Sequence, residues 1–293
     1  MKTIFKIVFI PIAILVFASC QDVVQIKLDE GSKLYVIDAF VNNLRSPQNI
    51  KVTTNDSYFS DREAPPVTNA NVVLVDLTTN ISYNFNYTTK GNYTYSLTPT
   101  DTIAKLNHNY MLKVTIDGYV YTSQATQKRT AVLDSIATYY NDGTSPFGGP
   151  KNTYYCLLFA RDKADNNPDY YWIRTFRNDT LFNDPGDLNI CIDGTGGIVT
   201  NAPTDTIQFT PSATFLGFKT YHKNDSCKVE IHSISHDTYF FLVQALNQIS
   251  NGGLFATTPE NVKSNIITPD AAKTKAVGWF NMASVVTKTK LIQ

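Results

Sequence analysis

Residues 109–126 read NYMLKVTIDGYVYTSQAT, and this stretch decides the fold class. Its two halves are rich in tyrosine, valine, isoleucine and threonine, residue types that favour β-strands. Between them lies Asp117-Gly118, and both residues of such a pair tolerate the positive φ that a two-residue hairpin turn requires. The stretch therefore predicts two antiparallel strands, Asn109–Ile116 and Tyr119–Thr126.

Similar short runs precede this hairpin at regular spacing. Turn signals such as Thr79-Asn80 and Lys90-Gly91-Asn92 separate them, because these residues adopt turn conformations readily. Regularly spaced short strands with such turns predict a mainly β fold, beginning with an immunoglobulin-like or transthyretin-like β-sandwich at residues 33–130. The further strands predicted there are Lys33–Val41, Gln48–Thr54, Ala70–Leu77, Ile81–Tyr87 and Asn92–Leu97.

The spacing of strands and loops changes after residue 130. Loops rich in glycine, proline and asparagine separate longer apolar runs, and residues 178–211 form a long stretch with little pattern. This change predicts a second, β-rich domain at residues 131–293. Its predicted strands are Leu133–Tyr140, Tyr154–Arg161, Asp169–Arg177, Asn261–Ile267 and Ala276–Thr287.

One amphipathic helix is predicted near residues 236–250. Ser235 is a favoured helix N-cap residue. The apolar residues that follow recur at the helical period, which places them on one stripe that would cover a sheet face or, alternatively, dock a partner. They are Tyr239, Leu242, Val243, Leu246 and Ile249.

The first twenty residues have the order of a lipoprotein signal peptide. Lys2 and Lys6 supply positive charge, residues 7–18 are apolar, and small residues precede Cys20. An apolar segment this short does not comfortably span about 30 Å of hydrocarbon, so cleavage after residue 19 is expected. Cys20 then becomes the acylated first residue, palmitate being an expected acyl chain, and residues 20–32 form a tether. A plain secretory signal or an uncleaved anchor is the alternative.

Composition and motifs exclude several classes of function. The chain has 25 basic and 25 acidic residues, and removal of Lys2 and Lys6 leaves 23 basic ones. Without basic runs, nucleic-acid binding has no electrostatic support. The sequence contains no Gly-x-Ser-x-Gly, His-Glu-x-x-His, P-loop or Cys-x-x-Cys motif. It therefore predicts a protein that is not an enzyme and carries no cofactor.

Two groups of residues resemble metal ligands only superficially. His222, Cys227, His232 and His236 include zinc-ligand types, but His232 is expected on the strand before the helix, so His232 and His236 need not share a face. Asp184, Asp187 and Asp193 crowd one loop without the spacing of a calcium loop. We therefore predict solvated side chains and no metal site.

Three cysteines remain when Cys20 carries lipid. An odd number in an oxidising compartment indicates either one bridge with one free thiol, or no bridge. Cys156 lies in an apolar run and is expected to be buried. Cys191 and Cys227 both border polar loops, so they are the candidate disulfide pair.

The chain resembles the Bacteroidota outer-membrane lipoproteins of domain of unknown function 4249 (DUF4249) over nearly its whole mature length. Several short sequence segments support the resemblance through their order and spacing. Each segment alone is common in strands or turns. They include Tyr58-Phe59, Pro65–Val72, Gly91–Tyr93, Tyr110–Val114, Asp117–Tyr121, Leu133–Ile136, Leu181–Asp184, the helix after Ser235, Pro259–Ile266 and Gly278–Phe280.

This resemblance implies an outer-membrane location, on either face, and frequent association with a TonB-dependent receptor. It supplies no catalytic residues. Exported proteins of this bacterial group are often O-glycosylated where Asp-Ser or Asp-Thr precedes an apolar residue. Four sites fit that pattern, although chance in a threonine-rich chain is the alternative: Thr102, Ser135, Thr180 and Thr206.

Three functions follow as expectations. The first is a non-enzymatic accessory or binding subunit of an outer-membrane uptake system, with the bilayer and a TonB-dependent receptor as partners. The second is a surface adhesin that binds glycans or peptides without a transporter. The third is a hydrolase whose site has no recognisable motif. A concave pocket with paired carboxylates would favour the third.

Overall fold

The computed structural model describes residues 31–57, 60, 62–101, 103–145, 148–161, 168–193, 209–210, 219–251 and 261–293. Strands dominate these residues, and the mainly β fold class is confirmed. The strands are β1 (Leu34–Asn42), β2 (Gln48–Thr54), β3 (Asn71–Asp76), β4 (Ile81–Tyr87), β5 (Asn92–Tyr95), β6 (Asn109–Ile116), β7 (Tyr119–Thr126), β8 (Val132–Asn141), β9 (Thr153–Arg161), β10 (Tyr170–Arg177), β11 (Thr180–Leu181), β12 (Asn189–Asp193), β13 (Phe209–Thr210), β14 (Ser226–Ile234), β15 (Lys275–Ala283) and β16 (Val285–Leu291). The described helices are the 3-10 turn η1 (Pro185–Asp187) and α2 (His236–Ile249).

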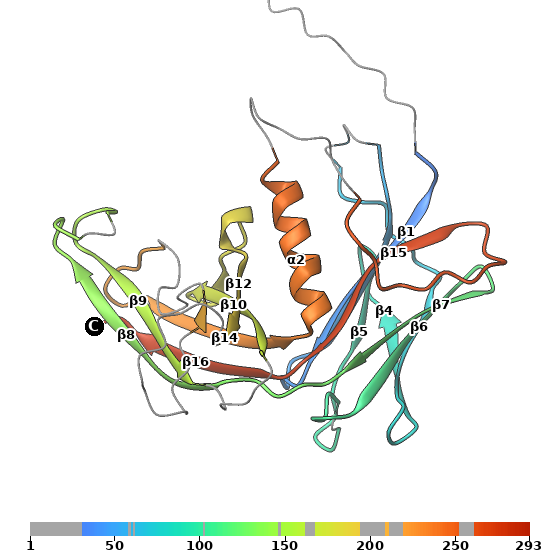
Figure 1. Cartoon of the computed structure of the whole chain (residues 1–293), viewed down its shortest axis with the longest axis horizontal. Helices are drawn as coiled ribbons and strands as arrows, with labels where there is room; N and C mark the ends of the chain where they lie inside the picture. The colour runs from blue at the N-terminus through green and yellow to red at the C-terminus, as the bar shows by residue number, and fades with distance from the viewer. Residues whose placement is uncertain are drawn as a thin grey trace, which may run out of the picture. The chain divides into compact units, whose positions relative to one another are not determined.

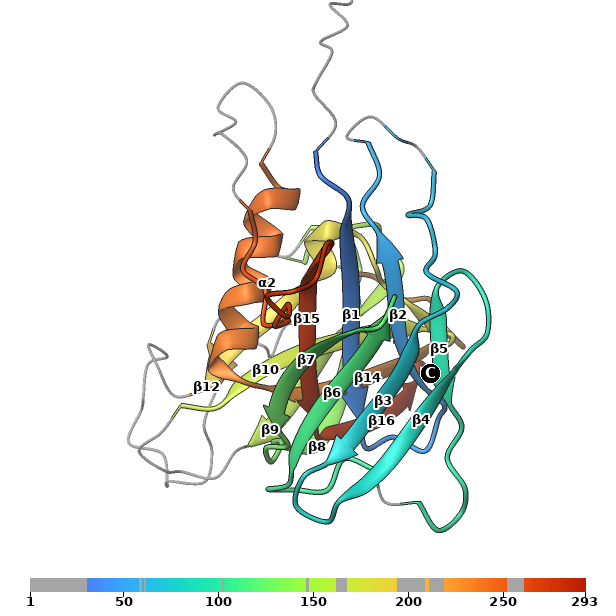
Figure 2. The ribbon, with the colours of Figure 1, turned by 90° about the vertical axis from the view of Figure 1, so that its right-hand side faces the viewer.

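The first sheet has eight strands in the order β15-β1-β2-β5-β4-β3-β6-β7 (Figures 1 and 2). Its two end strands come together: the Tyr121 hydroxyl in β7 donates to the carbonyl oxygen of Thr274, just before β15, at 2.7 Å. Thr122 also forms a β-bridge with Ile267. The sheet therefore curls around its own core as a sandwich-like or barrel-like layer.

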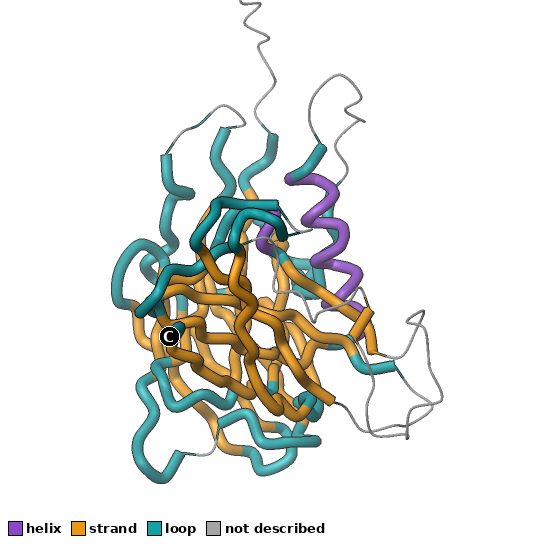
Figure 3. The backbone as a smooth tube through the Cα atoms, turned by 90° about the vertical axis from the view of Figure 1, so that its left-hand side faces the viewer, coloured by secondary structure: helices purple, strands orange, loops and turns teal. Residues whose placement is uncertain are grey.

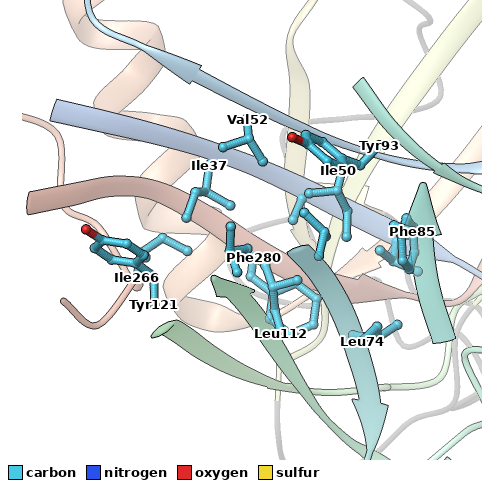
Figure 4. Close-up of a cluster of buried hydrophobic side chains, with 14 of the residues drawn as sticks. Ile37, Ile50, Val52, Leu74, Phe85, Tyr93, Leu112, Tyr121, Ile266 and Phe280 are labelled. Atoms are coloured by element: carbon cyan, nitrogen blue, oxygen red, sulfur yellow. The ribbon is translucent and has the colours of Figure 1, made fainter. Parts of the chain in front are cut away.

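Alternating side chains fill this core, because successive residues of a strand point to opposite faces. Ile37 of β1, Ile50 of β2, Leu74 of β3 and Leu112 of β6 are each at most 1% exposed. Figure 4 shows them converging with Phe280 of β15. The C-terminal part of the chain thus contributes to the first core.

The Asp117-Gly118 hairpin is confirmed. Both residues have positive φ, 51° and 81°, and Ile116 pairs with Tyr119 across the turn. The β6 and β7 bounds are those predicted, because the turn chemistry fixes the register of the two strands.

A second sheet of six strands has the order β13-β12-β10-β14-β16, with β11 paired to β10, and β8 and β9 form a separate two-stranded sheet. Side chains on one face of β10 and β14 pack with those of β8 and β9, among them Ile173, Val229 and Leu158. On the opposite face, Ile234 packs with Leu242 of α2. Figure 1 shows α2 beside β10, β12 and β14, and Figure 3 shows the same helix in purple.

The predicted helix is confirmed, and Ser235 caps it: the amide of Thr238 donates to Ser235 Oγ at 3.0 Å. Leu242 is buried, and Tyr239 and Val243 pack against the same cluster. Ile249 is 59% exposed, so the buried stripe ends before the last helical turn.

Two predicted C-terminal strands differ from the structure. Residues 261–267 contain no strand beyond the single bridge at Ile267. The run Ala276–Thr287 is two strands that join different sheets, β15 and β16. The chain changes sheets at Ser284, whose amide donates to Ser233 Oγ at 2.9 Å instead of continuing one ladder.

β15 pairs with β1 in parallel over its whole length. A strand from the predicted second domain therefore belongs to the sheet of the first, while the boundary near residues 130–131 stays a prediction. The described residues contain no helix that is long and apolar enough to cross a bilayer.

Candidate functional site

A cleft of about 290 Å³ lies where β6, β7, the start of α2 and β15 meet. Its lining comes from residues far apart in the sequence, which is typical of a site assembled by the fold. Amide side chains are the commonest polar groups in it. The lining residues are Asn109, Gln124, Ala125, Thr126, Lys128, Ser235, Asp237, Asn265, Trp279, Phe280 and Asn281.

Hydrogen bonds fix the buried polar groups behind this cleft. Trp279 Nε1 donates to Thr238 Oγ1 at 2.9 Å, and that hydroxyl donates to Asn281 Oδ1 at 2.9 Å. Asn281 is 2% exposed, and its Nδ2 has no partner among the described residues. A buried amide donor without a partner is costly. Asn281 is also one of the cleft-lining residues, so this donor without a partner lies at the floor of the cleft.

The rim of the cleft is polar and nearly neutral. Gln124 and Lys128 are exposed, and Thr126 Oγ1 donates to Asn109 Oδ1 at 2.6 Å. Asp237 is the single carboxylate among the lining residues. Acid–base hydrolysis of a glycoside uses two carboxylates, and this lining supplies one.

Sequence reasoning missed this cleft. The signal available was Asn281, a polar residue inside the apolar run AVGWFNMA at residues 276–283. That run predicts a buried strand, and a buried amide needs hydrogen-bond partners. The identity of those partners depends on the parallel pairing of β15 with β1, which local sequence patterns do not encode.

A second polar group lies on the face of β14 toward the helix. His232 Nε2 is 3.0 Å from Glu230 Oε2, and Arg174 Nη1 is 3.8 Å from the same oxygen. Burial alone would raise the pKa of Glu230, but the hydrogen bond and charge of His232 and the charge of Arg174 lower it overall. Burial is the largest effect on His232, and it lowers the pKa of that imidazole below 6.5. Burial therefore favours the neutral form of the His232 imidazole beside Glu230.

We expect this pair to make stability depend on pH. Because the pKa of His232 is lower in the folded than in the unfolded chain, the unfolded chain binds the proton first as pH falls. The free energy of unfolding should decrease below about pH 6.5, by about 1.4 kcal/mol per pH unit at most. Urea unfolding between pH 8 and 5 measures this. His232→Gln should flatten the dependence, and His222→Gln, at an exposed position, is the matched control. If the free energy of unfolding of His232→Gln depended on pH as steeply as that of the wild type, His232 would not be the group responsible.

The cysteine prediction requires a correction. Cys191 pairs with Tyr171 on one side of β10, whereas Cys227 pairs with Arg177 on the other side and six residues further along. At about 3.3 Å per residue this separates them by far more than a disulfide spans. Both cysteines are buried and neither is in a disulfide bond, so the predicted Cys191–Cys227 bridge is wrong. Polar flanking residues indicated loops, but both cysteines lie in strands.

The candidate metal ligands do not gather. His222 is exposed, His232 faces Glu230, and His236 Nδ1 lies 2.9 Å from Asp237. Lys219 Nζ lies 3.1 Å from Asp184 and 3.0 Å from Asp187, so these two carboxylates already share one ammonium group as their ion-pair partner. No metal-binding cluster occurs within the described ranges.

The remaining predicted sites divide into described and undescribed residues. Ser135 is exposed at a bulge in β8, and Thr180 is exposed in β11, so both hydroxyls can be reached from solvent. Cys20, Thr102 and Thr206 lie outside the described residues. Lipidation and O-glycosylation stay predictions.

Comparison with known proteins gives one family and little beyond it. The model of a family described as Domain of unknown function (DUF4249) matches residues 21–289. No curated protein matches. Among solved structures, the chicken CNTN1 FN1–FN3 domains match with 10% identity and a TM-score of 0.23. The match covers 71% of this chain and 64% of that one, and a likeness of this size does not bear on function.

Proposed function

The chain belongs to the DUF4249 family, and we propose that it is a Bacteroidota outer-membrane lipoprotein that acts, without catalysis, as an accessory or binding subunit of a TonB-dependent uptake system. One observation carries the proposal: positive charge, an apolar run and small residues precede Cys20 in the order that lipoprotein processing requires. Several acyl chains on Cys20, at about 0.8 kcal/mol per buried methylene, would hold the protein at the bilayer permanently.

The length of the tether favours a partner in the same membrane. Residues 21–32 span at most about 40 Å when fully extended, and the first strand begins at Leu34. The folded part therefore stays near the bilayer, within reach of an integral receptor. Confinement to one membrane raises the effective concentration of that receptor, so a weak interface suffices.

The cleft supports a binding role. Its polar groups are amides, hydroxyls, one ammonium and one carboxylate, together with an indole. Such groups orient a neutral cargo through hydrogen bonds. The paired carboxylates that would have favoured a hydrolase are absent from its lining.

Membrane separation after metabolic labelling with palmitate tests the location. We expect the labelled wild-type chain in the outer-membrane fraction, because Gln21 follows Cys20 where a retention signal for the inner membrane would place Asp. An unlabelled chain, or one recovered only with inner membranes, would contradict the proposal.

A surface glycan- or peptide-binding adhesin is the second candidate, and the amide-lined cleft is the observation that favours it. Calorimetric titration with neutral oligosaccharides and peptides would measure this binding. Gln124→Ala should weaken it about tenfold, the loss of roughly one hydrogen bond. Asn86→Ala, an exposed amide on β4, is the control. If Gln124→Ala and Asn86→Ala bound the ligand equally strongly, the ligand would bind outside this cleft.

A further inference from the structure

A second pocket, of about 210 Å³, is lined by β10, by the turn that follows β11 and by the last residue of α2. It shares no lining residue with the amide-lined cleft. It is smaller than the roughly 300–1,000 Å³ pockets that hold drug-sized molecules, so it suits a ligand of fragment size. Six of its ten lining residues are apolar, namely Trp172, Leu181, Phe182, Pro185, Leu188 and Ile249.

Arg174 also lines this pocket, and contacts along and across the sheet fix its position. Residues two apart on a strand point to the same face. The guanidinium carbon of Arg174 lies 5.1 Å from the centre of the Trp172 ring and 5.7 Å from that of the Phe176 ring. Its register partner on β14 is Glu230, whose Oε2 lies 3.8 Å from Arg174 Nη1. That distance allows charge attraction but is too long for a hydrogen bond.

The hydrogen-bonding capacity of this guanidinium is unused. An arginine has five N–H donors, and no hydrogen bond joins those of Arg174 to another described residue. Its Nε is buried without a partner, while the side chain as a whole is 28% exposed. Burial, opposed by the charge of Glu230, lowers the pKa of Arg174, so the surrounding protein stabilises this cation less well than water does.

The other charged groups of the pocket already have partners. Asp184 and Asp187 are the carboxylates of the lining, and they pair with Lys219 Nζ at 3.1 and 3.0 Å, which reduces their repulsion of an anionic ligand. Lys219 is not itself a lining residue, so Arg174 is the single cation among the ten described residues that line the pocket. A ligand acceptor that meets Arg174 therefore displaces no hydrogen bond between the guanidinium and a described residue.

We propose that this pocket binds a small carboxylic acid with an aromatic or aliphatic body, whose carboxylate meets Arg174 and whose body lies against Trp172 and Phe182. A guanidinium offers parallel N–H groups that fit the two oxygens of a carboxylate, and such charge-assisted bonds are roughly twice as strong as neutral ones. The apolar lining removes the body of the ligand from water. The Phe182 ring is held in place by an edge-to-face contact with Tyr221, with ring centres 6.0 Å apart.

Titration of the full chain carrying Cys20→Ala with phenylacetate tests the proposal, and phenylacetamide is the uncharged ligand of the same shape. Calorimetry should give a Kd for phenylacetate at least about tenfold lower than for phenylacetamide, the difference between charge-assisted and neutral hydrogen bonds. Trp172 reports the location, because the only other tryptophan, Trp279, lies in the cleft. Phenylacetate should change the tryptophan emission of this protein but not that of its Trp172→Phe variant.

Two matched substitutions on β10 test the guanidinium. Arg174→Lys keeps a positive charge near Glu230 and removes the planar fork, so it should weaken phenylacetate binding about tenfold. Arg177→Lys makes the same change on the same strand outside the pocket lining, and it should leave the Kd unchanged. Tm verifies that both variants fold, and the comparison of the two ligands on the protein carrying only Cys20→Ala depends on neither variant.

Phenylacetate that does not bind, or that binds no better than phenylacetamide, would overturn the inference. An emission change that persists in Trp172→Phe would do the same, as would equal Kd values for Arg174→Lys and Arg177→Lys. A tripeptide that ends in phenylalanine and binds more tightly than phenylacetate would identify the ligand as a chain terminus and not a small acid. The titration needs neither a membrane nor a receptor, so this inference and the proposed function can fail separately.

Discussion

Replacing Gly278 with alanine should destabilise the fold by about 3 kcal/mol or more, one of the two largest effects expected for a single substitution in this chain. Gly278 has a φ of 128°, which residues with a side chain rarely adopt. A Cβ atom there would lie 2.0 Å from the carbonyl oxygen of Ile37 and 2.8 Å from its backbone nitrogen and carbon. Ile37 is the register partner of Gly278 in the parallel β1–β15 pair.

The clash cannot be relieved by a side-chain rotation, because every contacting atom belongs to the backbone of a central strand. β15 would have to separate from β1, which would disturb the core around Phe280 and the cleft residues Trp279 and Asn281. Urea unfolding of the purified protein measures the loss. We also expect ligand binding in the cleft to fall with stability.

Gly118→Ala is the matched control. Gly118 also has a positive φ, 81°, but nothing lies within 4 Å of a Cβ built there. It should cost only about 1 kcal/mol, the strain of the left-handed conformation. Equal losses in the two variants would show that conformation alone, and not the close approach of β15 to β1, accounts for the glycine.

Replacing Cys20 with alanine should move nearly all of the protein from the membrane pellet to the soluble fraction. The substitution removes the sulfur that would carry the acyl chains, and with it the anchoring free energy of many buried methylenes. Folding should be unaffected, because the described core begins with β1 at Leu34. Immunoblotting of both fractions measures the distribution, and Tm measures the fold.

Cys191→Ala is the control for this substitution, since it removes a buried cysteine of β12 and leaves the anchor in place. It should stay in the membrane fraction. If Cys20→Ala also stayed there, another part of the chain would hold the protein at the membrane, and the proposed anchor would be incidental.

Local signals predicted the local parts of this fold. Asp117-Gly118 fixed the register of β6 and β7, and Ser235 marked the first residue before α2, because turn and cap chemistry act within a few residues. The parallel pairing of β1 with β15 joins segments more than 200 residues apart. The residue patterns of β1 and β15 do not identify the two strands as pairing partners. The order of strands in the sheet could therefore not be predicted from the sequence.

The candidate site residues show the same difference between local signals, which the sequence contains, and long-range contacts, which it does not. Cys191 and Cys227 were paired from their polar neighbours, yet they lie on opposite sides of β10. The cleft around Asn281 likewise depends on β15 lying against β1, which is why a single polar residue in an apolar run was the only sign of it.

The central claim is that the anchored protein works in contact with an integral outer-membrane receptor. The most direct measurement is affinity purification of the tagged wild-type chain from detergent-solubilised outer membranes, followed by mass spectrometry, beside Cys20→Ala prepared from the same cells. We predict a TonB-dependent receptor that is enriched with the wild type and lost with Cys20→Ala. Wild-type protein that brings no integral outer-membrane protein with it would contradict the account.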